Sequence, residues 1–342
     1  MNPKILFVDT YYPQFLKSWD FNPAASYESE LTRLLEFSFG TGDFYSRTLK
    51  FMGWETADII ENAPFSGLLS PVPLAPDVLF MQDLSLVNGL IGSPQPLLAG
   101  QCSCPWPGDD KIKRCDVVFT SFPHYVPRIE ALGVKAVYNP LAFDPIVLER
   151  TFQSMEEAAP FRQPDRIHDC VFIGGVGNPS HWREGMKTLE AVAREIPTFK
   201  WWGYGFDSLP SGSALSDKYQ GEAWGLDMYR ILLQSKIVLN RHGEVAEGYT
   251  NNMRCFEATG CGALLLTERS KNLHDFFSST EAAAYSGPEE AVYAIRGFLG
   301  NERLRKQIAE NGQARTLRDH TYSQRMQLVS STLMDLIGVE AK

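Results

Sequence analysis

Two segments of the chain contain residues suited to binding a phosphorylated ligand. The first is Val171–Gly185 (VFIGGVGNPSHWREG), in which a predicted strand ends at Ile173, glycines follow, and a helix begins near Ser180 or His181. Glycine lets backbone N–H groups approach a phosphate, and a helix N-terminus carries partial positive charge. Arg183 in the first turn can add a bidentate contact. A plain strand-to-helix turn is the alternative, because Ser180 replaces the third glycine of a dinucleotide fingerprint.

The second segment, Asn240–Gly262 (NRHGEVAEGYTNNMRCFEATGCG), follows an apolar run that ends at Leu239 and is unusually polar for its place. Thr250 or Asn251 is predicted to cap a helix, because short polar side chains accept hydrogen bonds from the first N–H groups. The remaining N–H groups at that helix start would hold a second anion.

Three side chains of this second segment could take part in chemistry. Arg254 and Glu257 are three residues apart and therefore share a face of the predicted helix. A guanidinium suits phosphate, and a carboxylate can accept from two vicinal ribose hydroxyls, so the pair suits a nucleoside diphosphate. A surface ion pair is the alternative. His242 follows the strand directly and could position sugar or phosphate, or could be a structural histidine.

These residues must be positioned by short apolar runs that alternate with helical patterns, as buried parallel strands and their crossover helices do. Strands are predicted at Ile5–Val8, Asp77–Met81, Leu97–Ala99, Asp116–Thr120, Lys135–Tyr138, Cys170–Ile173, Lys200–Trp202, Lys236–Leu239 and Ala263–Leu266. Helices are predicted at Glu28–Phe37, Phe44–Met52, His124–Leu132, Trp224–Gln234 and Met253–Thr259, from the glycine-rich turn to about residue 194, and at about 289–299, 301–311 and 322–337. The sequence therefore predicts an α/β fold with two parallel-sheet domains that bind ligand at the carboxyl ends of their strands.

The polar, proline-containing stretch Leu148–Asp169 is predicted to be the linker between the domains. This places a first domain at 1–160, a second at 165–318 and a C-terminal helix at 319–342. The polar stretch Arg315–Tyr322 is predicted to be a non-helical segment that separates this helix from the preceding one. The helix has an apolar stripe, which predicts that it returns to pack on the first domain. The stripe consists of Met326, Val329, Leu333 and Leu336.

Composition limits the class of protein. The 342 residues are 44% hydrophobic and 21% charged, and the net charge is −9, so a general nucleic-acid-coating role is disfavoured. The chain has no apolar run of about 18 residues and no signal-peptide pattern, which predicts a cytoplasmic protein without a transmembrane segment. The six cysteines have no disulfide or zinc spacing and are predicted to be reduced thiols.

The motifs resemble those of GT-B fold glycosyltransferases, close to the retaining "group 1" enzymes and their spore-maturation (CgeB-like) branch. The resemblance covers nearly the whole chain. In the first half, Asp116–Pro145 resembles the stretch before the interdomain linker. In the second half, Phe172–Gly175 with Arg183–Gly185 resembles "FVGR…KG", Gly203–Gly205 resembles "GxG", Gln220–Trp224 resembles the loop that meets the nucleobase, and Glu257–Gly262 resembles "EAMACG". The resemblance implies two Rossmann-like domains facing across a cleft, with nucleotide-sugar in the second and acceptor in the first.

The resemblance also implies roles for single residues. Those implied to bind the nucleotide-sugar are Gly174, Gly175, Gly205, Glu247, Thr250, Asn251, Asn252 and Glu257, with Glu257 on the ribose. Three departures stand out. The family's histidine after the third strand of the first half is not evident, and Gln101 is near its place. The family's first glutamate would fall at Tyr249, and either Glu247 or Asn252 with the backbone would replace it. The arginine of "FVGR" is Gly175 here, so one phosphate-binding cation is missing.

The expected reaction is transfer of a hexose from a UDP- or GDP-type sugar nucleotide to a glycan, lipid-linked or protein acceptor, as in the synthesis of cell-surface polysaccharide. Arg183, Arg254 and His242 are the candidate catalytic residues. No Asp-x-Asp occurs, so cations and helix N-termini are expected to neutralise the diphosphate without a metal, and no cofactor is expected. A sugar-nucleotide epimerase, a catalytically silent sugar-binding or assembly module and a nicotinamide-dependent dehydrogenase are the alternatives.

On the acceptor side, His124 is the candidate residue, with a structural role at a helix start as the alternative. An aromatic-rich segment, Tyr11–Tyr45, lies in the same domain. Its rings could stack on sugars or could form a core patch.

Overall fold

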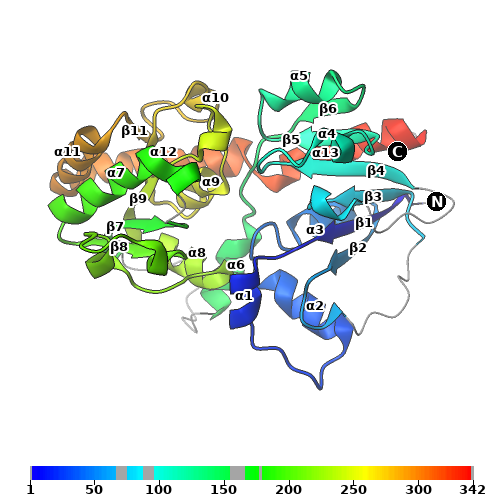
Figure 1. Cartoon of the computed structure of the whole chain (residues 1–342), viewed down its shortest axis with the longest axis horizontal. Coiled ribbons are helices and arrows are strands. Elements are labelled where there is room, and N and C mark those ends of the chain that lie inside the picture. Colours follow the sequence, from blue (N-terminus) through cyan, green and yellow to red (C-terminus); the bar gives the residue numbers. More distant parts are fainter. Residues whose placement is uncertain (1, 67–74, 88–95, 155–165, 177–178, 340–342) are drawn as a thin grey trace. The chain divides into compact units, whose positions relative to one another are not determined.

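The computed structural model describes residues 2–66, 75–87, 96–154, 166–176 and 179–339, with the backbone alone described at 179–184. The chain divides into two compact units (Figure 1). The first unit consists of Met1–Pro140 with Tyr322–Lys342, and the second of Leu141–Thr321. The division therefore falls before the predicted linker, because helix α6 (Ile146–Ser154) packs on helix α8 (Gly225–Leu233) of the second unit.

The first unit has a six-stranded parallel sheet in the order β2-β1-β3-β4-β5-β6. Its strands are β1 (Lys4–Asp9), β2 (Glu55–Ile60), β3 (Val78–Met81), β4 (Leu97–Cys102), β5 (Val117–Thr120) and β6 (Lys135–Tyr138). Its helices are α1 (Pro13–Ser18), α2 (Tyr27–Glu36), α3 (Phe44–Phe51), α4 (Asp109–Ile112), α5 (Tyr125–Glu130) and α13 (Tyr322–Ile337). Apolar side chains fill both faces of β3 and β5, as expected of central parallel strands.

The second unit has a five-stranded parallel sheet in the order β11-β10-β9-β7-β8. Its strands are β7 (His168–Ile173), β8 (Phe199–Trp202), β9 (Ser235–Asn240), β10 (Leu264–Glu268) and β11 (Ala283–Tyr285). Its helices, besides α6 and α8, are α7 (Pro179–Glu195), α9 (Met253–Gly260), α10 (Leu273–Phe276), α11 (Pro288–Gly300) and α12 (Glu302–Asp319).

Both sheets have the same doubly wound order when their strands are counted along the chain: second, first, third, fourth, fifth. In such a sheet the strand order reverses direction between the first and third strands, and ligands bind beside this switch point at the carboxyl ends. The switch point lies between β1 and β3 in the first unit and between β7 and β9 in the second.

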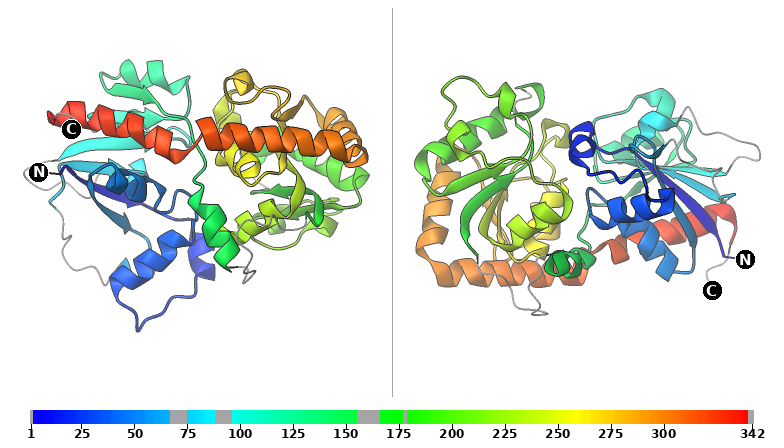
Figure 2. Two further views of the ribbon diagram at one scale, coloured as in Figure 1. Left: turned by 180° about the vertical axis from the view of Figure 1, so that it is seen from behind. Right: turned by 90° about the horizontal axis from the view of Figure 1, so that it is seen from below.

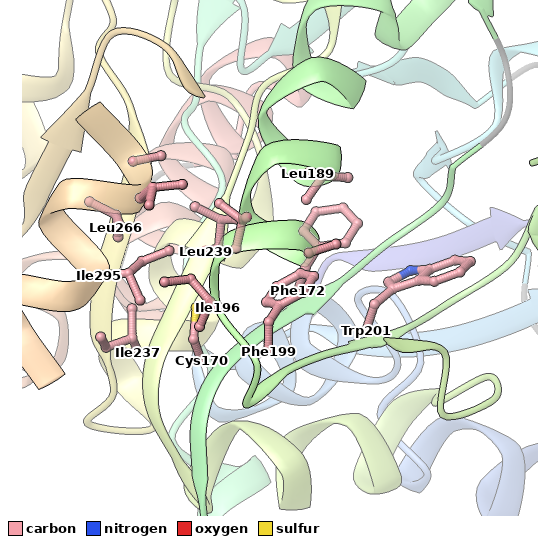
Figure 3. Close-up of a cluster of buried hydrophobic side chains, with 14 of the residues drawn as sticks. Cys170, Phe172, Leu189, Ile196, Phe199, Trp201, Ile237, Leu239, Leu266 and Ile295 are labelled. Carbon is pink, nitrogen blue, oxygen red and sulfur yellow. The ribbon is translucent and has the colours of Figure 1, made fainter. Parts of the chain in front are cut away.

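The core of the second unit lies between its sheet and helices α7 and α11, which pack on each other. Figure 3 shows Leu189 of α7 and Ile196, which directly follows α7, beside Phe172 of β7 and Phe199 of β8. Each of these four side chains is buried. The apolar stripe of α7 and the apolar face of the strands therefore hold β7 and β8 in place, and with them the loops at their carboxyl ends.

Helix α13 packs on α3 within the first unit and can be followed in red in Figure 2. Tyr322 lies against the rings of Phe44 and Tyr45, with ring centroids 5.5 and 5.4 Å away. Trp54 donates through its indole N–H to Ser330 at 2.8 Å. The predicted stripe is buried at Met326, Val329 and Leu333, but Leu336 is 36% exposed.

The observed elements differ from the sequence expectation at two strands and five helices, of which the short helices α1, α4 and α10 had not been predicted. Strands β2 and β11 had not been predicted; both lie at sheet edges, where β2 is half exposed and β11 has three residues. Helix α6 had not been predicted either; it begins at Ile146, before the proposed linker, and extends into it to Ser154. Helix α12 continues to Asp319 through the predicted break. There Arg318 is exposed, while Thr316 packs inward and its hydroxyl lies 2.6 Å from that of Thr259.

Candidate functional site

The carboxyl ends of β7 and β9 meet at the switch point of the second unit. Gly174 and Gly175 follow β7, and Arg241 and His242 follow β9. The Arg241 guanidinium donates through Nη2 to the carbonyl of Gly175 at 2.5 Å and therefore joins the two strand ends. Ligands of doubly wound sheets bind at this position.

The glycine-rich turn after β7 directs its carbonyl groups toward the protein. The Gly174 carbonyl accepts from the Trp201 indole at 3.1 Å, and the Gly175 carbonyl accepts from Arg241. Val176 N–H donates to the Tyr204 carbonyl at 2.9 Å. Among the described residues nothing accepts from the N–H of Gly175. The turn thus keeps its acceptors occupied and leaves a donor for an anion.

Two glycines of the predicted set are required by close contacts. A Cβ at Gly175 would overlap the ring of Tyr204. Gly205 has φ +92°, and a Cβ there would overlap the carbonyl oxygen of Val176. The strand-end loops of β7 and β8 therefore pack backbone against backbone at Gly205, and Tyr204 fills the space where a side chain at residue 175 would lie.

His242 is held as a neutral imidazole. The backbone N–H of His242 donates to the Glu268 carboxylate at 2.7 Å, and the ring Nε2 lies 3.2 Å from the Thr267 hydroxyl. Burial lowers the pKa of His242 to about 4. Its Nδ1 is buried and has no hydrogen-bond partner among the described residues. His242 can therefore exchange a hydrogen bond with a bound group, but it supplies no positive charge at neutral pH.

The start of helix α9 differs from the prediction. Its N-cap residue is Asn252, not Thr250 or Asn251, and Asn252 makes no side-chain capping bond. The Asn252 amide donates instead to the Arg241 carbonyl at 2.8 Å and to Asn240 Oδ1 at 3.0 Å. Thr250 is turned away from the helix, because its N–H donates to Asn272 and its hydroxyl lies 2.5 Å from that of Ser270. In the described part of the chain no side chain accepts from the first N–H groups of α9, which suits an anion.

Arg254 and Glu257 form the predicted pair, but inside the unit. Their side chains are 15% and 6% exposed, and Arg254 Nη1 lies 2.8 Å from Glu257 Oε2. Tyr229 donates to Glu257 Oε1 at 3.2 Å. Each carboxylate oxygen therefore has one protein partner and keeps acceptor capacity for one more. The charge of Arg254 is opposed at close range by that of Glu257.

The other predicted residues of this unit lie as follows. Glu247 is exposed, with φ +49°, and its carbonyl accepts from Lys271 at 2.8 Å. Asn251 has a buried Oδ1 without a hydrogen-bond partner among the described residues. Arg183 belongs to helix α7, but its side chain lies outside the described part of the chain.

In the first unit, His124 is the N-cap residue of α5 and contacts the rings of Phe122 and Tyr125, with centroids 5.2 and 4.7 Å away. The ring contacts give His124 a structural environment, and its role toward an acceptor stays a prediction. The aromatic segment mainly forms core: Tyr11 and Phe15 are buried, and Phe15 stacks on Phe39 at 4.2 Å. Tyr12 is 52% exposed.

The sequence prediction missed Arg241 and Tyr204. Arg241 is the second residue of the polar segment that had been singled out, but its neighbour His242 was chosen. The available signal was an arginine immediately after a buried strand, where side chains reach the carboxyl edge of the sheet. The contact partner could not be found from spacing, because Arg241 and Gly175 are 66 residues apart.

Two further searches cover the described residues only. They contain no group of three or more His, Cys, Asp or Glu side chains placed to hold a metal ion. None of their helices combines the length and the apolar composition needed to cross a membrane. All six cysteines are free.

Comparison with known proteins gives the fold. Sucrose-phosphate synthase from Thermosynechococcus elongatus is similar over 98% of this chain and 100% of its own, with a TM-score of 0.59 and 12% identity. HepE from Anabaena, solved with UDP, covers 97% of this chain and 100% of its own at a TM-score of 0.55 and 14% identity. The glycosyltransferase AviGT4, involved in avilamycin A biosynthesis, covers 98% of both chains at a TM-score of 0.58 and 14% identity.

The chain has the GT-B fold. The expected two parallel-sheet architecture is thereby confirmed. In sequence, residues 183–331 match the model of the family described as "Glycosyl transferase-like", so this GT-B protein carries a glycosyl transferase-like region that includes β8 to β11. No curated protein matches the chain in sequence.

Proposed function

We propose that this GT-B protein is a glycosyltransferase that moves a sugar from a nucleoside diphosphate donor of the UDP or GDP type. One observation carries the proposal. The carboxyl edge of the second unit's sheet presents hydrogen-bond donors to an anion at the switch point, and the β9 and α9 part of this edge lies in the region that matches the glycosyl transferase-like family. The donors come from the turn at Gly175 and from the uncapped start of α9. The structure of HepE with UDP is consistent with this type of ligand.

The chemistry follows from charge development on the donor. As the anomeric bond breaks, the departing diphosphate gains negative charge, and pre-organised cations and helix N-termini stabilise it. The uncapped start of α9 supplies such donors, and Arg183 on α7 and Arg254 are the proposed cations. His242, being neutral, orients sugar or phosphate by a hydrogen bond. Glu257 has an acceptor site left on each oxygen for the ribose hydroxyls.

The finer features of the reaction are also part of the proposal. A retaining, front-face reaction needs no protein base, since the leaving phosphate takes the acceptor proton. The donor is proposed to carry a hexose, and the acceptor to be a glycan, a lipid-linked group or a protein. The absence of Asp-x-Asp in the sequence supports turnover without a metal. We further propose that the protein belongs to the spore-maturation branch of the family. We also propose that it resides in the thiol-reducing cytoplasm, which the six free cysteines support.

A binding titration and a donor screen test the proposal in sequence. Trp224 stacks on Tyr204 with ring centroids 5.9 Å apart, and Trp201 bonds the glycine-rich turn, so tryptophan fluorescence should respond to a ligand there. UDP or GDP should quench it, and NAD should not. Release of the nucleoside diphosphate (UDP or GDP) from sugar nucleotides is then measured with mixed glycan acceptors.

The outcomes separate the alternatives. Acceptor-dependent diphosphate release supports a transferase. Conversion of the donor sugar to its epimer without release would instead indicate an epimerase. Binding without any turnover across the screen would indicate a silent sugar-binding module. Quenching by NAD alone would overturn the proposal in favour of a dehydrogenase.

A further inference from the structure

The glycine-rich turn lacks the arginine that the resemblance leads one to expect at residue 175, and the structure shows where a cation lies instead. Resting on the proposed function, we propose that Arg241 is a positioning residue of the diphosphate subsite. It supplies the buried positive charge that residue 175 does not, and it holds the Gly175 carbonyl away from the ligand.

The geometry places this charge at the turn itself. Arg241 Nη2 donates to the Gly175 carbonyl at 2.5 Å, and the guanidinium carbon lies 5.3 Å from the centroid of the Phe172 ring. The bond to Arg241 occupies the Gly175 carbonyl, which would otherwise present partial negative charge to a phosphate bound at the turn.

The packing explains why the cation comes from another strand. A side chain at residue 175 would collide with Tyr204, whose ring fills that space. Arg241 reaches the turn because α7 carries a glycine where the side chain passes: a Cβ at Gly185 would lie 2.5 Å from Arg241 Cδ and 2.9 Å from Nη1. The glycines at 175 and 185 and the arginine at 241 thus form one arrangement.

The electrostatics are consistent with a protonated side chain at an anion subsite. Arg241 is 4% exposed, and burial lowers its pKa to about 10, so the guanidinium remains protonated at neutral pH. Glu268 is a nearby carboxylate that favours this charge, and burial raises its own pKa. Burial of a charge is costly unless compensated, and a diphosphate at the turn would add compensating negative charge.

The test compares ligands that differ only in phosphate. Affinities of the full chain for uridine, UMP and UDP, with the guanosine series in parallel, are measured by calorimetry for the wild type, Arg241→Met and Arg241→Lys. Arg241→Met should weaken diphosphate binding about 10- to 100-fold, the effect of losing one hydrogen bond with a charged group, and should change nucleoside binding less than about threefold. Arg241→Lys should be intermediate, since it keeps the charge but not the planar fork.

The control is Arg194→Met, which removes an exposed arginine from the same unit and should leave all three affinities within about twofold. A parallel loss of nucleoside and diphosphate affinity in Arg241→Met would show a merely structural role and overturn the inference. Unchanged diphosphate affinity would do the same. A wild-type protein that binds no nucleoside diphosphate would instead overturn the proposed function.

A second variant leaves the arginine in the chain. Gly185→Ala puts a methyl group on the path of the Arg241 side chain, and alanine favours the helix. It should therefore reduce the preference for diphosphate over nucleoside at least fivefold while the protein stays folded. Gly297→Ala, at a glycine of α11 with open space around it, is the matched control and should change nothing. If Arg241→Met fails to fold, an unchanged diphosphate preference in Gly185→Ala overturns the inference.

Discussion

At the scale of single residues, burial decides what the charged groups of the second unit can do. Arg254 and Glu257 are three residues apart, as a surface ion pair would be, but both are largely buried and Glu257 also accepts from Tyr229. Breaking a buried pair leaves an uncompensated charge and destabilises a protein strongly. A substitution here therefore reports on stability and on ligand binding at once, and the two effects must be measured separately.

Glu257→Gln is expected to weaken nucleoside diphosphate binding by about 1–3 kcal/mol, because the carboxylate hydrogen bonds to the ribose hydroxyls are lost. The measurement is a titration with UDP or GDP and with the 2′-deoxy analogue. The wild type should prefer the ribonucleotide, and the variant should not. If Glu257 serves only the ion pair, the variant will melt earlier but keep both the affinity and the ribose preference.

His242 should make the stability of the protein depend on pH. Its pKa is about 4 in the folded state, against an ordinary value of 6.5, so between these values the unfolded chain binds more protons. The stability contribution is therefore complete above pH 6.5 and is lost as the pH falls toward 4. His242→Gln should flatten this decline in urea unfolding between pH 4 and 6.5.

Two carboxyl groups of the first unit act in the opposite direction. Burial raises the pKa of Asp9 and Asp58 to about 7, so their protonated forms favour the folded state at low pH and their contribution falls as the pH rises from 3.8 to 7. Comparison of His242→Gln with the wild type cancels the effect of these carboxyl groups, because both proteins contain them.

The control for the His242 prediction is His274→Gln, at an exposed histidine, which should leave the decline in stability unchanged. An identical decline in His242→Gln and wild type would contradict the assignment.

At the scale of elements, α13 shows that an amphipathic pattern predicts a helix but that packing decides which of its apolar residues are buried. The apolar residues recur at helical spacing, and the helix packs on α3 of the first unit although it is far from it in sequence. The last member of the stripe, Leu336, remains 36% exposed, whereas Leu333 is fully buried. The chain thus offers two leucines on one helix with opposite environments.

Leu333→Ala should lower the free energy of unfolding by about 2–5 kcal/mol, because a fully buried leucine leaves a cavity. Leu336→Ala should lower it by less than about 1 kcal/mol, since the side chain is partly in water. Both are measured by chemical denaturation, followed by the fluorescence of Trp54, whose indole bonds Ser330 of the same helix. Equal losses from the two variants would mean that α13 is not docked as described.

At the scale of the whole molecule, the two units repeat one topology, and their switch points carry different side chains. The first unit has Asp9, Thr10 and Asp83 there, with the Thr10 hydroxyl donating to Asp83 at 2.6 Å. The second has glycines, Arg241 and the uncapped start of α9. An anion is thereby favoured in the second unit and disfavoured in the first, which agrees with a donor diphosphate bound to the second unit alone.

Turnover is expected to survive metal removal. The proposed neutralisation of the diphosphate by arginines and backbone N–H groups needs no divalent ion. Initial rates are measured after EDTA treatment and again with added magnesium or manganese, and they should agree within about twofold. An absolute requirement for the added ion would contradict the mechanism.

The amino-acid sequence by itself determined most strands and helices, because brief apolar runs and helical spacing are local properties of the chain. It also located the glycine-rich turn and the Arg254–Glu257 pair. The edge strands β2 and β11 were not predicted from the sequence, since an edge strand needs few apolar residues. Helix α6 was not predicted from the sequence, because the apolar face that stabilises it is buried only by packing against α8.

Only the tertiary structure decided how the site is assembled. Strand order brings Arg241 to Gly175 across 66 residues, and no local pattern contains that order. Likewise, Asn252 bonds Asn240 and the Arg241 carbonyl instead of capping α9, although asparagine at an N-cap ordinarily bonds its own helix. The physical reason is the same in each case: a buried polar group takes whichever partner the packed neighbours present, and sequence spacing does not record those neighbours.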